Sequence, residues 1–246
     1  MPPEPPTSPT ASPGVPLTPA ERAEEAEILD REGLDPAVVE DALGELSRVN
    51  RLLFGYRPVV RTLLPRLLDG PARQTVLDVG TGSGDVADAL ARKVRRRGRE
   101  VTVVGVDRKL AHLLAGRRRG IRQQRVAADA EALPFRDGAA DWSLSTLFFH
   151  HFGAETNLAI LAEMRRTARR GAVVVDLRRN RFGELVGRLL IPLTGAGFIT
   201  RHDGRVSLAR CWRFRDVAAL VSRLPVRELK RRFPFRFSLV VGPGGS

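Results

Sequence analysis

The sequence contains a single cysteine, Cys211, among its 246 residues. One cysteine excludes an internal disulfide and a metal site made only of cysteines, and it is typical of a small core residue. No run of about 18 apolar residues occurs, so we expect no transmembrane helix. The first residues lack the cationic and apolar regions of a secretory signal. We therefore expect a cytoplasmic protein without a metal site.

Lysine and the aromatic residues are scarce as well. Only Lys93, Lys109 and Lys230 contribute to the 41 basic residues, and the formal net charge is +13. The excess of arginine, with abundant Ala, Gly and Pro, is typical of a GC-rich genome. Aromatic residues make up 6% of the chain and do not interleave with the arginine runs, as base-stacking platforms would. We therefore interpret the arginine runs as solvated faces and expect no nucleic-acid partner.

The most informative segment that is present is Val76–Gly84, which reads Val-Leu-Asp-Val-Gly-Thr-Gly-Ser-Gly. It predicts a buried strand that ends in a glycine loop and leads into a helix beginning near Asp85. Glycines let the backbone turn sharply and approach a ligand closely, and the loop is expected to point N–H groups and a positive helix end at that ligand. Further strands ending at Asp107 and Asp129 indicate βαβ units with acidic residues at one sheet edge.

A dinucleotide is the first candidate ligand, but the details disfavour it. The dinucleotide fingerprint is G-x-G-x-x-G, whereas this loop is G-x-G-x-G and is followed by Asp85. Asp78 and Asp85 would repel a pyrophosphate, while Asp78 suits an ammonium or a sulfonium. Asp107 suits the two hydroxyls of a ribose, because a carboxylate accepts two hydrogen bonds. These features describe a nucleoside joined to an amino acid, such as S-adenosylmethionine.

On these residues the chain resembles the class I S-adenosylmethionine-dependent methyltransferases over roughly residues 50 to 240. Val76–Gly84 is similar to the first motif of that family, Asp107 to its ribose-binding acid, Asp129-Ala130 to its adenine-binding segment, and 140–147 to its fourth-strand motif. The segment 161–176 is similar to the helix, turn and strand of the small-molecule branch, which modifies quinone precursors, phenolic lipids or polyketides. The resemblance implies the cofactor S-adenosylmethionine and this set of cofactor-binding residues: Asp78, Gly80, Thr81, Gly82, Gly84, Asp107, Arg108, Asp129, Ala130 and Thr146.

The expected fold is a Rossmann-like, doubly wound α/β sheet of seven strands, mostly parallel with an antiparallel last strand. Its strands are expected near residues 75–79, 101–106, 123–128, 141–147, 172–177, 226–232 and 235–241. Helices are expected near 85–97, 109–119, 155–169, 182–193 and 215–224, with a loop at 195–204. Residues 71–246 would form the methyltransferase domain.

Residues 1–17 are rich in Pro, Ser and Thr and predict a disordered tail. Residues 18–70 predict a helical extension with three helices: one from Thr18 to about Arg31, one from Asp35-Pro36 to about Ser47, and one near Pro58–Leu68. In the resembled family such an extension lies over the cofactor and the substrate entrance.

Methyl transfer to a hydroxyl or an acidic carbon often needs a base that removes a proton. Four histidines are present. We expect His112 on a helix surface, whereas His150 and His151 follow the fourth strand, where the family's active site opens. His202-Asp203 is expected in a loop and offers a second base with its orienting acid. The candidate catalytic residues are therefore His150, His151 and His202, and strand capping by the first two is an equally acceptable interpretation.

No Asn-Pro-Pro-Tyr-like segment follows the fourth strand, where 146–149 read Thr-Leu-Phe-Phe. This departure disfavours transfer to the amino group of a base or glutamine and favours a small, hydroxylated, apolar acceptor. An RNA methyltransferase and a non-catalytic cofactor-binding relative remain as alternatives. Weak contact with a membrane surface also stays open, and the acceptor's identity, O- or C-methylation and the oligomeric state are not encoded in these patterns.

Overall fold

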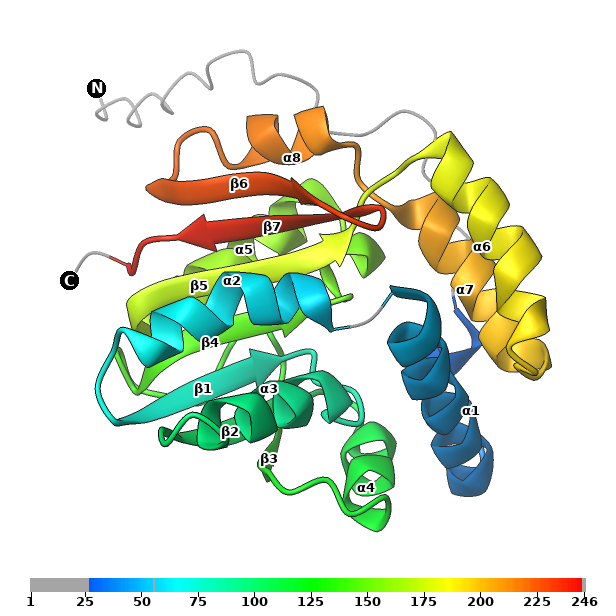
Figure 1. The fold of residues 1–246 in the computed structure, drawn as a ribbon, viewed down its shortest axis with the longest axis horizontal. Coiled ribbons are helices and arrows are strands. Elements are labelled where there is room, and N and C mark those ends of the chain that lie inside the picture. The colour runs from blue at the N-terminus through cyan, green and yellow to red at the C-terminus, as the bar shows by residue number, and fades with distance from the viewer. Residues whose placement is uncertain (1–26, 55, 245–246) are drawn as a thin grey trace, which may run out of the picture.

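The computed structural model describes residues 27–54 and 56–244 and contains one seven-stranded sheet in the order β3-β2-β1-β4-β5-β7-β6 (Figure 1). The strands are β1 (Arg73–Val79), β2 (Glu100–Asp107), β3 (Gln124–Ala127), β4 (Ala140–Thr146), β5 (Ala168–Leu177), β6 (Val226–Arg232) and β7 (Arg236–Val241). β7 runs antiparallel to both β5 and β6, whereas β1 to β5 pair in parallel. The expected sheet, with its antiparallel last strand, is confirmed.

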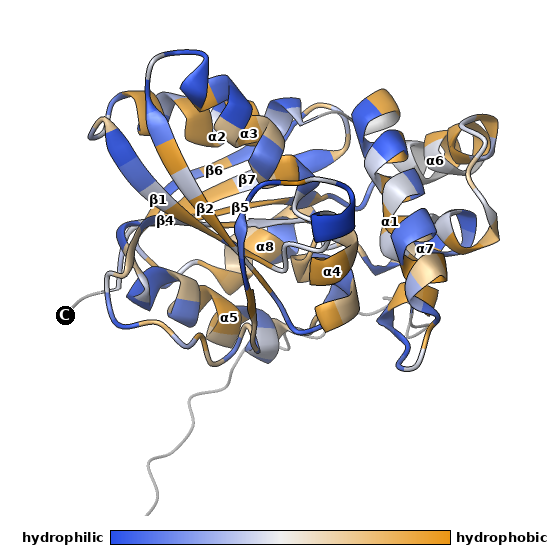
Figure 2. Ribbon diagram, turned by 90° about the horizontal axis from the view of Figure 1, so that it is seen from below, coloured by the Kyte–Doolittle hydropathy of each residue, from blue (hydrophilic) through white to orange (hydrophobic). Residues whose placement is uncertain are grey.

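Helices cover both faces of the sheet and its carboxyl edge. They are α1 (Pro36–Val49), α2 (Arg57–Leu68), α3 (Asp85–Arg95), α4 (Leu110–Arg118), α5 (Ala154–Arg166), α6 (Arg181–Leu193), α7 (Phe198–Arg210) and α8 (Phe214–Leu220). α2 and α3 pack on one face, and α5 and α8 pack on the other (Figure 2). α1, α6 and α7 lie beyond the carboxyl ends of the parallel strands (Figure 1).

The strands of the sheet are buried on both faces, which explains their consecutive apolar residues in the sequence. In β5, the run from Ala172 to Val175 is fully buried, and in β1 the run from Val76 to Val79 is buried as well. Consecutive apolar residues of this kind are expected when helices cover both faces of a parallel sheet. Cys211 is a buried thiol that donates a hydrogen bond to the Ser207 carbonyl, in keeping with the core position expected for it. Within the described ranges, no helix is long and apolar enough to cross a bilayer.

The N-terminal extension differs from its prediction at its start. The predicted helix from Thr18 lies mostly outside the described residues, as does the whole tail 1–17. Its described end is not α-helical, because Glu27 is extended and Ile28–Asp30 form a short 3-10 helix, η1. The second helix begins as expected, since the Asp35 side chain accepts a hydrogen bond from the Ala37 N–H and Pro36 occupies the first helical position.

The predicted loop at 195–204 is wrong. Gly197 precedes α7 in an extended conformation, and the helix begins at Phe198 and includes His202. Gly204 and the β-branched Ile199 and Thr200 weaken the local helical signal. Burial of Asp203 and Val206, which are three residues apart on one helix face, favours the helix in the folded protein.

Candidate active site

A cavity of about 340 Å³ opens where β1, β2 and β4 end, beneath the N-terminal segment. Its walls come from the glycine loop, the β2–α4 junction, the segment after β3, the segment after β4, η1 and α1. Six of the ten expected cofactor-binding residues line it: Gly80, Gly82, Asp107, Arg108, Asp129 and Ala130. Asp78, Thr81, Gly84 and Thr146 lie behind this lining.

The three loop glycines have different roles, although all have positive φ values. A Cβ at Gly80 would lie 2.3 Å from the Phe148 ring, and one at Gly84 would lie 2.1 Å from the Gln123 amide. Gly82, at φ +55°, has no heavy atom within 4 Å of such a Cβ. Gly82 is therefore the loop position that borders open space, where a ligand can approach the backbone.

The loop amides are not free donors, in contrast to the sequence-based expectation. The N–H groups of Gly80 and Thr81 both donate to the Val106 carbonyl at 2.9 Å, and that of Gly82 donates to Asp107. At the start of α3, the Asp85 side chain accepts hydrogen bonds from Ser47 and Tyr56, which connects the loop to the N-terminal extension. The loop thus contributes close approach rather than a set of unpaired N–H groups.

Asp107 ends β2 and is fixed by the backbone around it. Its two oxygens accept the Gly82 and Lys109 N–H groups, each at 2.9 Å. A carboxylate oxygen accepts more than one hydrogen bond, so the group keeps capacity for hydroxyl donors. His112 was expected on the surface, but it lines the cavity with Nδ1 3.6 Å from an Asp107 oxygen. Because α4 begins three residues after Asp107, its first turn stays close to the strand end.

Asp78, near the end of β1, lies behind the cavity lining and is 1% exposed. Its Oδ2 accepts a 2.6 Å hydrogen bond from Thr81 Oγ1, while Oδ1 has no partner in the described part of the chain. Burial raises the pKa of Asp78 to about 7, and the Asp85 and Asp107 carboxylates add to the effect. A cationic group nearby would stabilise the ionised form, which fits the ammonium and sulfonium of S-adenosylmethionine.

The segment after β3 forms the remaining wall on this side. Asp129 accepts a hydrogen bond from the Glu131 N–H at 2.9 Å, which shapes the turn that carries Ala130. Asp129 and Ala130 both line the cavity, as their resemblance to an adenine-binding segment implies.

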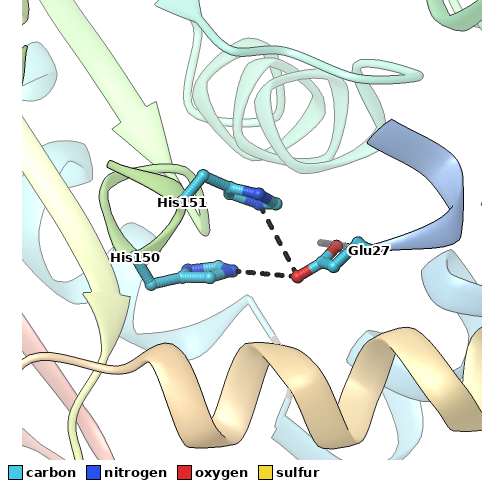
Figure 3. A group of neighbouring side chains, drawn as sticks. All are labelled: Glu27, His150 and His151. Atoms are coloured by element: carbon cyan, nitrogen blue, oxygen red, sulfur yellow. Dashed lines mark ion pairs between the residues drawn. The ribbon is translucent and has the colours of Figure 1, made fainter. Parts of the chain in front are cut away.

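Two of the candidate catalytic histidines, His150 and His151, lie side by side in η3 (Phe149–His151), directly after β4 (Figure 3). His150 is buried, with Nδ1 2.8 Å from Asp176 and Nε2 3.7 Å from Glu27 Oε1. His151 lines the cavity, with Nδ1 3.1 Å from Asp30 and Nε2 3.9 Å from the same Glu27 oxygen. The two rings thus share one carboxylate between their Nε2 atoms, while each has its own carboxylate at Nδ1.

The charges of this cluster are set by burial and by the pairing. Burial favours the neutral form of His150, but the Asp176 and Glu27 carboxylates outweigh it and raise its pKa to about 9. Despite their burial, the pKa values of Glu27 and Asp176 are lowered by the histidines. His150 is therefore a fixed cation at neutral pH and a poor proton acceptor, which leaves His151 as the ring available at the cavity wall.

A pH-dependent stability follows from His150. Its pKa is raised from 6.5 to about 9, so its contribution is complete below pH 6.5 and is lost as the pH rises toward 9. We expect the free energy of unfolding to fall by roughly 1–3 kcal/mol between pH 7 and 9. Chemical denaturation across this range measures the effect. His150→Gln should flatten the profile, and an unchanged slope in that variant would contradict the assignment.

Glu27, His150 and His151 each offer one ligand atom within 4.8 Å of the other two. Nitrogen and oxygen donors of this type suit a divalent cation. The Nε2–Oε1 separations of 3.7 and 3.9 Å exceed the roughly 3.3 Å between ligands of a tetrahedral zinc ion, so the side chains would have to close around it. The present spacing fits an ion pair between the His150 cation and Glu27 rather than a bound metal ion.

His202 lies apart from the other two candidates. It lines a second cavity of about 630 Å³ between α6 and α7. The expected pairing with its neighbour exists, because Nδ1 lies 2.9 Å from Asp203 Oδ1. However, Asp203 also accepts the Ile28 and Leu29 N–H groups, at 2.7 and 3.0 Å, and so holds the N-terminal segment in place.

Residues 27–31 form a strap across the cavity, where Glu27, Leu29 and Asp30 contribute to its lining. Lys109 Nζ donates to the Leu29 and Arg31 carbonyls, each at 3.0 Å. Ser207 donates to Glu27 at 2.5 Å. The strap is thus attached to both α4 and α7, in line with the expectation that the N-terminal extension covers the entrance.

Comparisons with known proteins identify a domain and its fold. Residues 76–171 match the family model described as a methyltransferase domain. No curated protein matches the chain in sequence. Among solved structures, an S-adenosylmethionine-dependent methyltransferase from Aquifex aeolicus is 18% identical with a TM-score of 0.55, over 85% of this chain and 98% of its own.

Two further structures have similar folds. The magnesium protoporphyrin IX methyltransferase of Synechocystis, solved with S-adenosylmethionine bound, is 15% identical with a TM-score of 0.54 and covers 87% of this chain and 100% of its own. A methyltransferase from Haloferax volcanii, solved in complex with the Trm112 activator, is 16% identical with a TM-score of 0.56. The match covers 85% of this chain and 96% of the Haloferax chain. Residues 76–171 therefore match a methyltransferase domain, and the described chain has the fold of solved S-adenosylmethionine-dependent methyltransferases.

Proposed function

We propose that the protein transfers a methyl group from S-adenosylmethionine to a hydroxyl of a small, apolar acceptor such as a phenolic lipid, a quinone precursor or a polyketide. The position of His151 is the observation that carries this proposal. Its ring belongs to the cavity wall together with Leu147, Phe148 and Phe152, so a proton acceptor lies within an apolar, aromatic surface. Such a surface suits an aromatic ring or a prenyl-like chain that carries one hydroxyl.

The cofactor supplies an already activated methyl group, and the chain's own residues must orient the acceptor and remove its proton. In one tautomer of His151, Nδ1 carries the proton and donates a hydrogen bond to Asp30. Nε2 is then unprotonated and serves as the base that takes the proton of the acceptor hydroxyl. Gly80 and Gly82 allow close approach of the cofactor, Asp107 binds its ribose, and Asp129-Ala130 border its adenine. The Asp78 carboxylate faces its cationic end.

The lining of the cavity disfavours RNA as the acceptor. Five carboxylates belong to it, from Glu27, Asp30, Asp107, Asp129 and Glu131, against the two cations Arg108 and Lys109. The Lys109 ammonium is engaged by the strap, and a polyanion would need a basic surface at this position. The structures with similar folds do not decide between RNA and a small molecule as the acceptor, because they include both a porphyrin methyltransferase and a partner of Trm112. An open cavity also disfavours a non-catalytic relative with a filled site.

The size of the cavity indicates how the acceptor enters. A volume of about 340 Å³ is at the lower end of the range for small-ligand pockets, so it suits one ligand rather than two. We infer that the strap moves outward when cofactor and acceptor bind together. Such a movement would break the hydrogen bonds to Lys109, Asp203 and Ser207 and would release the buried Leu29 from its cluster with Leu43 and Ala115.

Transfer of a labelled methyl group tests the proposal. The protein is incubated with methyl-labelled S-adenosylmethionine and three acceptors: an alkylphenol, its O-methyl ether and total RNA. We expect the label on the free phenol only. Label in RNA and none in any phenol, quinol or polyketide phenol would overturn the small-molecule assignment.

A proton release should accompany cofactor binding. At pH 6 Asp78 is mostly protonated, because burial raises its pKa to about 7. The cationic cofactor favours the carboxylate, so binding at pH 6 should release up to one proton and binding at pH 8.5 almost none. Calorimetry in buffers of different ionisation enthalpy measures this number. Asp78→Asn should abolish the release at pH 6, and an equal release in that variant would exclude Asp78 as its source.

A further inference from the structure

α6 exposes a ridge of leucines beyond the edge of the sheet. The exposed fractions are 53% for Leu185, 61% for Leu189 and 81% for Leu193, and these residues are spaced four apart along one side of the helix. Leu190 and Phe198, the first residue of α7, extend this apolar surface. Five of the ten exposed large apolar side chains among the described residues thus fall within 14 consecutive positions.

The opposite side of α6 is already used for packing. Gly187 and Ile191 face α7, where a Cβ at Gly187 would lie 2.4 Å from Leu208, and Ile191 is buried. The leucine ridge is therefore not part of the core, and no described element covers it. Its exposure in water is unfavourable, which indicates a partner.

Two arginines lie next to Phe198, at the end of this apolar surface. Arg201 and Arg205 follow Phe198 at helical spacing on α7, are exposed, and line the cavity between α6 and α7 together with it. No ion pair joins either guanidinium to a carboxylate within 27–54 and 56–244. An exposed apolar helix face that continues into a helix with unpaired arginines is typical of a segment that lies in the interface of an anionic bilayer.

We propose that the α6–α7 hairpin docks on the surface of an anionic phospholipid bilayer. α6 has 13 residues and is about 20 Å long, too short to cross a bilayer but suited to lie along its surface. The net charge of +13 adds a general attraction to anionic lipids. A symmetric contact between two copies would instead bring the arginines of both copies together. The inference deepens the proposed function, because an apolar acceptor partitions into the bilayer and would enter from there.

Vesicle binding tests the docking without cofactor, acceptor or turnover, so its result is independent of the proposed function. Full-length protein is mixed with vesicles of phosphatidylglycerol and phosphatidylcholine in equal parts, or of phosphatidylcholine alone, and the bound fraction is measured by sedimentation. We expect binding to the mixed vesicles and at least 10-fold weaker binding to phosphatidylcholine. No binding of the intact protein to the mixed vesicles would overturn the proposal.

Matched variants locate the contact. Leu189→Glu with Leu193→Glu should weaken vesicle binding at least 10-fold, whereas Leu52→Glu with Leu110→Glu, at leucines that are 70% and 59% exposed elsewhere, should not. Arg201→Gln with Arg205→Gln should weaken it, and Arg96→Gln with Arg97→Gln, at the exposed end of α3, should have a smaller effect.

Two outcomes would contradict the docking surface even if vesicles bind. If the α6 leucine pair and its control pair have equal effects, the attraction is a general property of a basic protein. If the α6 pair instead converts a dimer to a monomer in light scattering and leaves vesicle binding unchanged, a second copy covers the ridge. All of the substituted leucines are exposed, so thermal unfolding should show that each variant is folded.

Discussion

Gly82→Val is expected to abolish S-adenosylmethionine binding while the protein stays folded. No heavy atom lies within 4 Å of a Cβ at this position, so the added methyl groups extend into the space in which the cofactor must approach the loop. We expect the dissociation constant to rise by at least 100-fold, or about 2.7 kcal/mol. Isothermal titration calorimetry with S-adenosylmethionine and S-adenosylhomocysteine measures this loss.

Gly98→Val provides the matched control. Gly98 has a φ of +70° and an equally open Cβ position, but it lies in the turn between α3 and β2, away from the cavity. Both variants carry the backbone strain of a β-branched residue at positive φ, on the order of 1–3 kcal/mol. We expect similar losses of melting temperature and a normal cofactor affinity in Gly98→Val. An affinity of Gly82→Val within threefold of the parent would show that the cofactor does not lie against this glycine.

His151→Ala should reduce kcat by about 100-fold or more, because the acceptor hydroxyl loses its proton acceptor. The cofactor dissociation constant should stay within about threefold of the parent value, since the ring faces the acceptor side of the cavity. Steady-state kinetics at saturating cofactor, together with calorimetry, separate the two quantities.

The other two candidate histidines serve as comparisons. His202→Ala should reduce kcat far less than His151→Ala, because His202 lines the separate cavity between α6 and α7. His150→Ala should act mainly through stability, because that ring is buried and paired with Asp176. A larger loss of kcat in His202→Ala than in His151→Ala would move the reaction to the second cavity. Survival of turnover in all three variants would mean that alignment alone drives the transfer.

The sheet and the cofactor side of the site were predictable from local sequence. Strands buried on both faces appear as apolar runs, so β1, β2 and β5 start within a few residues of their predicted positions and end within one. Gly82 and Asp107 are found at their expected places because the glycine loop and the acid after β2 are fixed by short-range geometry. The hydrogen bonds that occupy the loop amides were not predictable, because they depend on the Val106 carbonyl in a neighbouring strand.

The acceptor side depends on contacts between distant parts of the chain. Glu27 meets Ser207 across 180 positions, and Asp30 meets His151 across 121. No local pattern of charge or hydropathy indicates such pairs. His112 was misplaced because a helical position near a strand end resembles any other surface position in the sequence. Lys109 directly follows Asp107-Arg108 and holds the strap, but its position in the sequence does not by itself indicate that contact.

A structure of the ternary complex with S-adenosylhomocysteine and a phenolic acceptor shows directly whether His151 is placed to act as the base. We expect the acceptor hydroxyl to lie within about 2.6–3.2 Å of His151 Nε2, with the strap displaced from its present contacts and the adenosine against Gly82 and Asp107. An acceptor bound in the cavity between α6 and α7, with its hydroxyl next to His202 and the strap unmoved, would contradict it.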